Sequence, residues 1–151
     1  MLELKDVHSY YGNIHALKGI SFTVDDGEIV TLIGANGAGK STTMRTIQGL
    51  LRPRQGTVLL NGVALEKLPT DQIVAQGVSQ APEGRQIFPR MSVLENLQMG
   101  AYQRKDKDGI QKDLDRVFEL FPRLKERIKQ AGGTLGKNEC TASATAAGGW
   151  A

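Results

Sequence analysis

The chain has 151 residues, of which 40% are hydrophobic and 23% charged, and its formal net charge is +3. This length allows one domain with a real core, and the mild, dispersed charge gives no indication of a nucleic-acid partner. The single cysteine, Cys140, cannot form an internal disulfide, which fits a reducing cytosol. The acidic N-terminus is not a secretory signal, and no apolar run approaches the ~20 residues that span a bilayer. Any work at a membrane therefore requires a partner there.

The chain begins with patterns that are typical of strands. Leu2, Leu4 and Val7 alternate roughly and predict an edge strand. Residues 16–24 predict a second strand, which ends at the Asp-Asp-Gly turn of residues 25–27.

A glycine-rich loop then lies between an apolar run and a helical pattern. Residues 28–33 are compact, β-branched and apolar, which predicts a buried strand of a parallel sheet. Residues 41–51 have apolar side chains at helical spacing, and Gly49 and Pro53 end the helix. The predicted apolar face of this helix contains Met44, Ile47, Leu50 and Leu51.

The middle of the chain predicts short elements. Residues 57–60 read as a strand, and the Asn-Gly pair at 61–62 is typical of a tight hairpin turn. Thr70 can cap a short helix that ends near Gly77, and residues 78–81 predict a brief strand.

The C-terminal part predicts helices. Ser92 and Glu95 have the spacing of a capping box, so a helix should begin at Ser92. Residues 106–121 are amphipathic, Pro122 ends that helix, and a short basic helix follows through Gln130. The apolar face of the long helix contains Ile110, Leu114, Val117, Phe118 and Phe121.

The composition changes after Leu135. Residues 136–151 consist largely of Gly, Ala, Ser and Thr and show no periodicity, which predicts a disordered or loosely attached tail. We therefore divide the chain into a domain at 1–135 and an aberrant tail at 136–151.

Residues 34–42, GANGAGKST, match the G-x-x-x-x-G-K-[ST] pattern of a phosphate-binding loop. Its glycines let backbone N–H groups point at phosphate oxygens, Lys40 offers a positive charge to the β- and γ-phosphates, and the Ser41 hydroxyl can ligate magnesium. The helix that follows directs its N-terminal dipole at the same anions. We predict binding of ATP with magnesium, through loop residues Gly34, Asn36, Gly37, Ala38, Gly39, Lys40, Ser41 and Thr42.

Beyond this loop the sequence resembles the ATP-binding subunits of ABC transporters, in particular the LivF-type subunits of branched-chain amino acid importers. Residues 16–62 run like the core of that family, whereas the N-K-x-D motif of a GTPase does not occur. Tyr11, in a Tyr-Tyr-Gly segment, matches the aromatic residue that stacks on adenine, a contact that needs a flat ring. The resemblance covers about residues 1–135.

Residues 81–102 resemble the segment after the family's glutamine loop, which borders the groove for a helix of the membrane subunit. Glu83 occupies the position where most members carry a magnesium-ligating glutamine, and a carboxylate can also hold magnesium. The resemblance thus implies Ser41 and Glu83 as metal ligands, with Gln80 as the alternative to Glu83. The helix around Phe118 resembles the helical subdomain of the same subtype.

The resemblance ends before the residues that carry hydrolysis in the family. An S-G-G-x-Q signature should follow residues 133–135, but the chain continues GKNEC. We identify no catalytic residue, because a strand ending in aspartate, a catalytic glutamate and a switch histidine have no counterpart. His8 and His15 lie on the first strands and are expected at the surface or half-buried. A frameshift, a truncation and a natural short form all remain open explanations.

The resemblance implies an incomplete α/β fold. It consists of a P-loop NTPase (ABC ATPase) core, an N-terminal antiparallel β subdomain and part of the helical subdomain. Without the strands encoded later in the family, residues 28–33 should lie exposed at a face or edge of the sheet, in a marginally stable chain.

The implied function is that of an ATP-binding subunit that couples ATP hydrolysis to branched-chain amino acid import. It would act at the cytoplasmic face of the bacterial inner membrane as a peripheral protein. Its partners would be transmembrane permease subunits, a second ATP-binding subunit and, indirectly, a substrate-binding protein, with no nucleic acid. The alternatives are a nucleotide-binding fragment without turnover, a subunit of a urea or short-amide importer, and a non-transport ABC protein that acts in DNA repair or translation.

Overall fold

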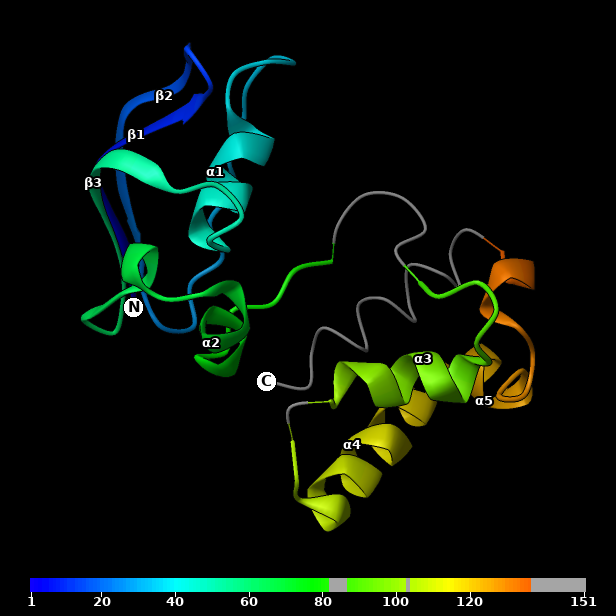
Figure 1. The fold of residues 1–151 in the computed structure, drawn as a ribbon. Coiled ribbons are helices and arrows are strands. Elements are labelled where there is room, and N and C mark those ends of the chain that lie inside the picture. Colours follow the sequence, from blue (N-terminus) through cyan, green and yellow to red (C-terminus); the bar gives the residue numbers. More distant parts are fainter. Residues whose placement is uncertain (82–86, 103, 137–151) are drawn as a thin grey trace. The chain divides into compact units, whose positions relative to one another are not determined.

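A computed structural model describes residues 1–81, 87–102 and 104–136 (Figure 1). The chain divides into two compact units, Met1–Val78 and Ser79–Ala151, and each unit has a hydrophobic core of its own. Among the described residues, no helix has the length and apolar character that crossing a membrane requires.

The first unit contains a four-stranded antiparallel sheet with the strand order β2-β1-β3-β4. The strands are β1 (Leu2–Tyr11), β2 (Ile14–Val24), β3 (Pro53–Leu60) and β4 (Val63–Ala64). The predicted antiparallel subdomain is confirmed. The prediction of β1 as an edge strand was wrong, because β3 returns from far along the chain and pairs with the side of β1 that β2 leaves open.

Two backbone features shape this sheet. The pairing of β1 with β3 is irregular between Lys5 and His8, where Asp6 has φ 46° and Gly56 of β3 has φ 82°. The predicted turn at 61–62 is confirmed, since both of its residues have positive φ and join β3 to β4. Such left-handed turns match the twist of the strands that they connect.

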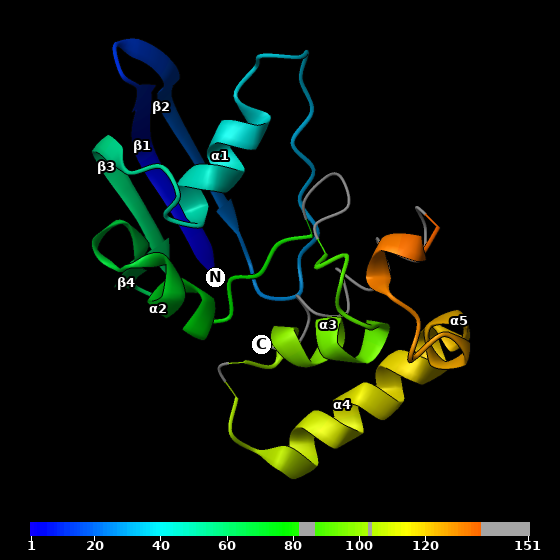
Figure 2. The ribbon, with the colours of Figure 1, turned by 45° about the vertical axis from the view of Figure 1, so that its right-hand side comes forward.

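Helix α1 (Lys40–Ile47) packs beside the sheet (Figure 2). The helix is confirmed, but its predicted face is only partly right, because Met44 and Leu50 are exposed while Thr43 and Thr46 are buried. Small hydroxyl residues fit here because their polar atoms find partners: Thr46 shares a buried 3.0 Å hydrogen bond with Ser9 of β1. The core of the unit contains Leu4, Val7, Leu17, Ile47, Val58, Leu65 and Ile73.

The segment between β2 and α1 differs from its prediction. Residues 28–33 form no strand, and the side chains of Ile29 and Ile33 are 94% and 92% exposed. The prediction of a buried strand was therefore wrong. The expected exposure of the segment is confirmed, but the segment is not a strand at a face or edge of the sheet. A strand forms only where a partner satisfies its backbone groups, and within the described parts of the chain no ladder includes these residues.

The remaining elements of the first unit are short. A 3-10 turn, η1 (Leu65–Lys67), precedes α2 (Thr70–Ala75). Helix α2 confirms the predicted short helix, but its N-cap is Pro69, so the predicted capping role of Thr70 was wrong. The brief strand predicted at 78–81 does not form.

The second unit is helical, with α3 (Val93–Gly100), α4 (Lys107–Leu120), α5 (Pro122–Glu126) and η2 (Gly132–Thr134). The predicted capping box at Ser92 is present in full, and the apolar face of α4 packs into the core as predicted. Helix α5 ends before the predicted Gln130. The core contains Val93, Leu97, Ala101, Leu114, Val117, Phe118, Leu124 and Leu135.

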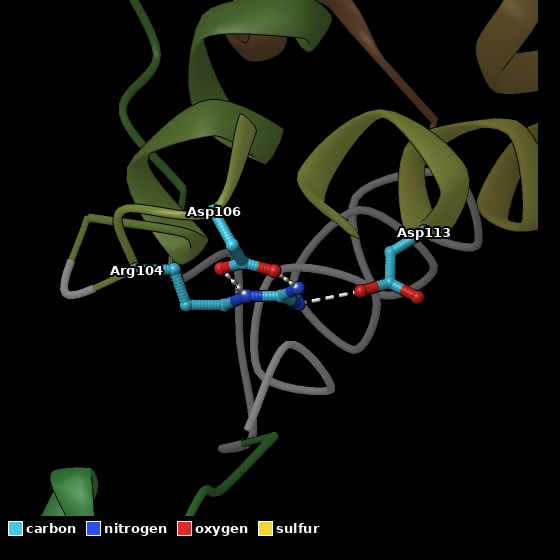
Figure 3. Close-up of polar contacts among 3 residues, drawn as sticks. All are labelled: Arg104, Asp106 and Asp113. Atoms are coloured by element: carbon cyan, nitrogen blue, oxygen red, sulfur yellow. Dashed lines mark hydrogen bonds and ion pairs between the residues drawn. The ribbon is translucent and has the colours of Figure 1, made fainter. Parts of the chain in front are cut away.

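An arginine organises the connection between α3 and α4 (Figure 3). The guanidinium of Arg104 donates through Nε to Asp106 at 2.9 Å and through a terminal nitrogen to Asp113 at 2.5 Å. Gly109 lies against this group, because a Cβ there would overlap the Asp106 carboxylate and approach the Arg104 guanidinium. The ion pairs thus fix the residue that precedes α4 to the body of that helix. The tail predicted at 136–151 lies, beyond Gly136, outside the described residues.

Candidate nucleotide-binding site

The glycine-rich loop turns directly into the N-terminus of α1. Gly37 and Gly39 have φ values of 88° and 93°, which side-chain-bearing residues rarely adopt, and Gly39 is the N-cap of the helix. A Cβ on Gly39 would also lie 2.8 Å from Cδ2 of Leu17 on β2. Gly39 is therefore needed both for the turn and for the close packing of the loop on the sheet.

The lysine of the motif folds back over its own loop. Its Nζ donates hydrogen bonds to the carbonyl oxygens of Gly34 and Ala35, the latter at 2.9 Å. The loop also closes on itself, because the N–H of Ala38 donates to the Ala35 carbonyl at 3.1 Å. The positive charge of Lys40 is therefore held at the loop whose glycines permit N–H groups to turn toward an anion.

The hydroxyl residues after Lys40 divide by burial. Thr43 is buried and donates its hydroxyl hydrogen bond to the Gly39 carbonyl at 2.9 Å, which ties α1 to its N-cap. Ser41, in contrast, is exposed at the start of α1. Its hydroxyl is therefore accessible to a ligand at the helix N-terminus.

Tyr11 ends β1 beside the same helix. Its side chain is 39% exposed, and Arg45 of α1 donates to its hydroxyl at 3.4 Å. This contact with Arg45, together with a weaker one from Thr42, lowers the pKa of the Tyr11 phenol. Tyr11 and Thr42, which we proposed from different parts of the sequence, thus lie together at α1.

The ring of the neighbouring Tyr10 contacts other side chains. Its ring stacks on His15 with centroids 4.2 Å apart, and the guanidinium of Arg54 lies 4.5 Å from the Tyr10 centroid. His15 in turn shares a 3.0 Å hydrogen bond with His8. Because Tyr10 already has aromatic and cationic neighbours, Tyr11 is the tyrosine of this pair with the more accessible ring. Both histidines are half-buried, which agrees with the expectation that they lie at the surface or half-buried.

The structure leaves the second proposed metal ligand undescribed. Glu83 lies outside the described residues, while its alternative, Gln80, is exposed. Among the described residues, no cluster of His, Cys, Asp and Glu has the geometry to hold a metal ion. The hydrogen bond from Arg45 to Tyr11 could not be predicted from the sequence, because it joins side chains that are 34 residues apart.

The glycine-rich loop, with Lys40 held against it at the N-terminus of α1, has the arrangement of a P-loop protein. The model of the ABC transporter family matches residues 17–146, and the chain therefore belongs to the ABC transporter family.

Known members of the family show how much of the fold is represented. The chain is 48% identical over 139 residues to the high-affinity branched-chain amino acid transport ATP-binding protein BraG of Pseudomonas aeruginosa, covering 92% of the chain and 59% of that protein. It is 32% identical to the probable branched-chain amino acid transport ATP-binding protein LivF of Archaeoglobus fulgidus, covering 97% and 62% of the two chains. A solved ATP-binding subunit of an ABC transporter matches with a TM-score of 0.87 and 29% identity, over 98% of this chain and 61% of that one.

The chain thus spans about three fifths of the length of these relatives. Its fold is an incomplete P-loop NTPase fold of the ABC ATPase type, which confirms the fold class expected from the sequence.

Proposed function

We propose that this chain forms the nucleotide-binding part of the ATP-binding subunit of an ABC importer for branched-chain amino acids. The observation that carries the proposal is the glycine-rich loop at the N-terminus of α1, with the Lys40 ammonium held against it. The names of the BraG and LivF relatives, both branched-chain amino acid transport proteins, support the class of cargo. Import of that cargo would be the work of a whole transporter, of which this chain supplies one component.

Each residue in the site has a distinct role in this proposal. Lys40 would exchange the carbonyl oxygens of its own loop for β- and γ-phosphate oxygens, which carry more negative charge and bind the ammonium more strongly. N–H groups around Gly37 and Gly39 would surround the same phosphates. The ring of Tyr11 would stack on the adenine, and the Arg45 contact would limit the movement of that ring.

Magnesium bound with ATP would neutralise phosphate charge, and the exposed hydroxyl of Ser41 is the described group that would hold it. Glu83 remains our proposal for a second ligand. The other contacts proposed in the loop are Gly34, Asn36, Ala38 and Thr42.

The second candidate is nucleotide binding without turnover. The family to which the chain belongs hydrolyses ATP, but the printed sequence contains no S-G-G-x-Q segment after Leu135. In the family that segment contacts ATP held by a second subunit. As the chain stands, we infer that it binds ATP and turns it over slowly or not at all.

The proposed partners follow from the family. We propose that transmembrane permease subunits and a second ATP-binding subunit assemble with this protein, and that a substrate-binding protein acts through the permease. The protein would then lie at the cytoplasmic face of the plasma membrane as a peripheral subunit.

A titration with a fluorescent ATP analogue, run beside a phosphate-release assay, tests both candidates. Lys40→Ala should weaken binding of the analogue by about tenfold or more, since charge-assisted phosphate contacts contribute roughly 1.5–3 kcal/mol. Lys18→Ala, which removes an exposed lysine on β2, is the matched control and should leave binding unchanged.

The outcomes separate the candidates. Binding without phosphate release supports the second candidate, whereas phosphate release that Lys40→Ala abolishes supports turnover by this chain. Equal binding by the two lysine variants would contradict the assignment of the site itself.

A further inference from the structure

Asn96 is a buried polar residue in the middle of helix α3. Its side chain is 5% exposed, and it lies next to Leu97 and one turn before Gly100 at the end of the helix. Buried carboxamides are costly unless their donors and acceptor find partners. The partners of Asn96 are all backbone atoms of one short loop at residues 88–92, which we call the pre-α3 loop.

The carboxamide uses both of its ends. Its Oδ1 accepts from the N–H of Phe88 at 2.8 Å. Its Nδ2 carries two hydrogens, which three carbonyl oxygens share, those of Phe88 at 3.0 Å, Met91 at 3.2 Å and Ser92 at 2.9 Å. A carboxylate of the same shape could only accept, and a leucine could do neither. The arrangement therefore depends on the amide chemistry of this residue rather than on its volume.

The same loop is bonded on its other side to a segment that follows α5. The N–H of Gly132 donates to the Met91 carbonyl at 2.8 Å, and that of Gly133 donates to the Pro89 carbonyl at 3.0 Å. An isolated antiparallel bridge joins Ser92 to Ala131. We call residues 130–135 the post-α5 segment. The Met91 carbonyl thus receives hydrogen bonds from both Asn96 and the post-α5 segment.

Close packing accompanies these bonds. A Cβ on Gly132 would lie 3.1 Å from Nδ2 of Asn96 and 3.2 Å from the Phe88 carbonyl oxygen. A Cβ on Gly133 would lie 3.0 Å from Cβ of Pro89. The two segments therefore approach closely around the Asn96 carboxamide, and little room remains for one to move without the other.

We propose that Asn96 is a positioning residue, whose carboxamide holds the pre-α3 loop and the post-α5 segment together as one body with α3. This body presents the Phe88 ring, which is 54% exposed although its backbone is bonded twice to Asn96. An apolar ring on an ordered backbone loses little conformational entropy when a protein partner covers it. That the partner is a permease subunit rests on the function proposed above, whereas the positioning role does not.

Amide hydrogen exchange on the full chain tests this role. Asn96→Asp should increase the exchange rates of the Met91, Gly132 and Gly133 amides together by about ten- to a hundredfold, the range expected when buried polar groups lose their partners. The amides of Leu114 and Val117 within α4 should change much less. Gln98→Glu, which makes the same chemical change at an exposed position of α3, is the matched control and should leave all of these rates unchanged.

Measuring the exchange rates of Asn96→Asp at several pH values separates the hydrogen-bonding role of residue 96 from its packing. The carboxyl introduced by Asn96→Asp faces three carbonyl oxygens, which raises its pKa and favours the protonated form. Protonation restores one donor, so protection should return in part as the pH falls through that raised pKa. Asn96→Leu, which cannot ionise, should show the loss of protection without this recovery.

Two results would overturn the proposal: loss of protection in only one of the two segments, or equal effects of Asn96→Asp and Gln98→Glu. If Asn96→Asp unfolds α4 as well, Gly132→Ala decides, since it presses on the carboxamide and leaves Asn96 in place. Faster exchange at Met91 in that variant supports the role, and an unchanged rate refutes it. A failure of the ATP-analogue titration would leave these outcomes unaffected, so the two proposals can fail separately.

Discussion

Two glycines, Gly56 in the middle of β3 and Gly62 in the turn that follows this strand, offer a test of how the sheet is built. Gly56 and Gly62 have nearly equal φ values of 82° and 83°. A Cβ on Gly56 would lie well inside van der Waals contact with the carbonyl oxygens of Lys5 and Asp6 on β1, whereas a Cβ on Gly62 would meet nothing within 4 Å. Alanine at either position bears the same strain of a left-handed backbone, and only Gly56→Ala adds a clash with the central strand.

The magnitudes follow from these two terms. A left-handed alanine costs about 1–2 kcal/mol, which is the whole effect expected for Gly62→Ala. The clash at Gly56 involves backbone that cannot rotate away, so forced shifts add roughly 1–3 kcal/mol, for a total loss of about 2–5 kcal/mol.

Urea unfolding of both variants, followed by far-ultraviolet circular dichroism, measures the difference. Gly56→Ala should lower the midpoint much more than Gly62→Ala, or leave the first unit unfolded. Equal midpoints for the two variants would refute the close approach of β3 to β1 at Asp6.

Three further predictions concern charged groups. Arg45→Met should raise the pKa of Tyr11 toward the ordinary phenol value, because it removes the hydrogen bond that contributes most to lowering that pKa. A titration followed by tyrosine absorbance measures the change. An unchanged Tyr11 pKa in the variant would contradict the contact between Arg45 and Tyr11. The pKa of Glu95 is lowered chiefly by the hydrogen bond from the backbone N–H of the N-cap serine. The ionised Glu95 carboxylate therefore stabilises α3 fully above the ordinary carboxyl pKa, and this stabilisation is lost as the pH falls through the lowered pKa. Glu95→Gln should remove this acid sensitivity from the melting of α3. Arg104→Met should raise the pKa of Asp106, which the Arg104 guanidinium lowers (Figure 3); a carbon-detected NMR titration with an unchanged Asp106 midpoint would contradict these ion pairs.

The elements that the sequence predicted well are those whose determinants are local. The capping box at Ser92 needs only residues three positions apart, and the turn at 61–62 needs only two residues that tolerate positive φ. Helix α4 could be predicted because its apolar residues recur on one face. The glycine-rich loop is also defined by local residues, since its motif needs only glycines, a lysine and a hydroxyl within nine consecutive residues, and its binding of phosphate stays a prediction.

The predictions that were wrong depended on distant partners. Residues 28–33 have a composition typical of a buried strand, but a strand also requires a neighbour, and none of the described strands pairs with them. The face of α1 was misjudged because Thr43 and Thr46 are polar by composition, yet each is buried once its hydroxyl has a partner.

Local patterns in the sequence were enough to indicate the family of this protein, the position of its glycine-rich loop and the helices that begin and end at local signals. Only the folded chain shows that β1 lies between β2 and β3, that Tyr11 contacts Arg45, and that the Met91 carbonyl accepts hydrogen bonds from both Asn96 and Gly132. Local signals act between residues that are close in the sequence, so they depend little on the rest of the fold. Strand order and buried hydrogen bonds join residues that are far apart in the sequence, so they exist only once the chain has folded.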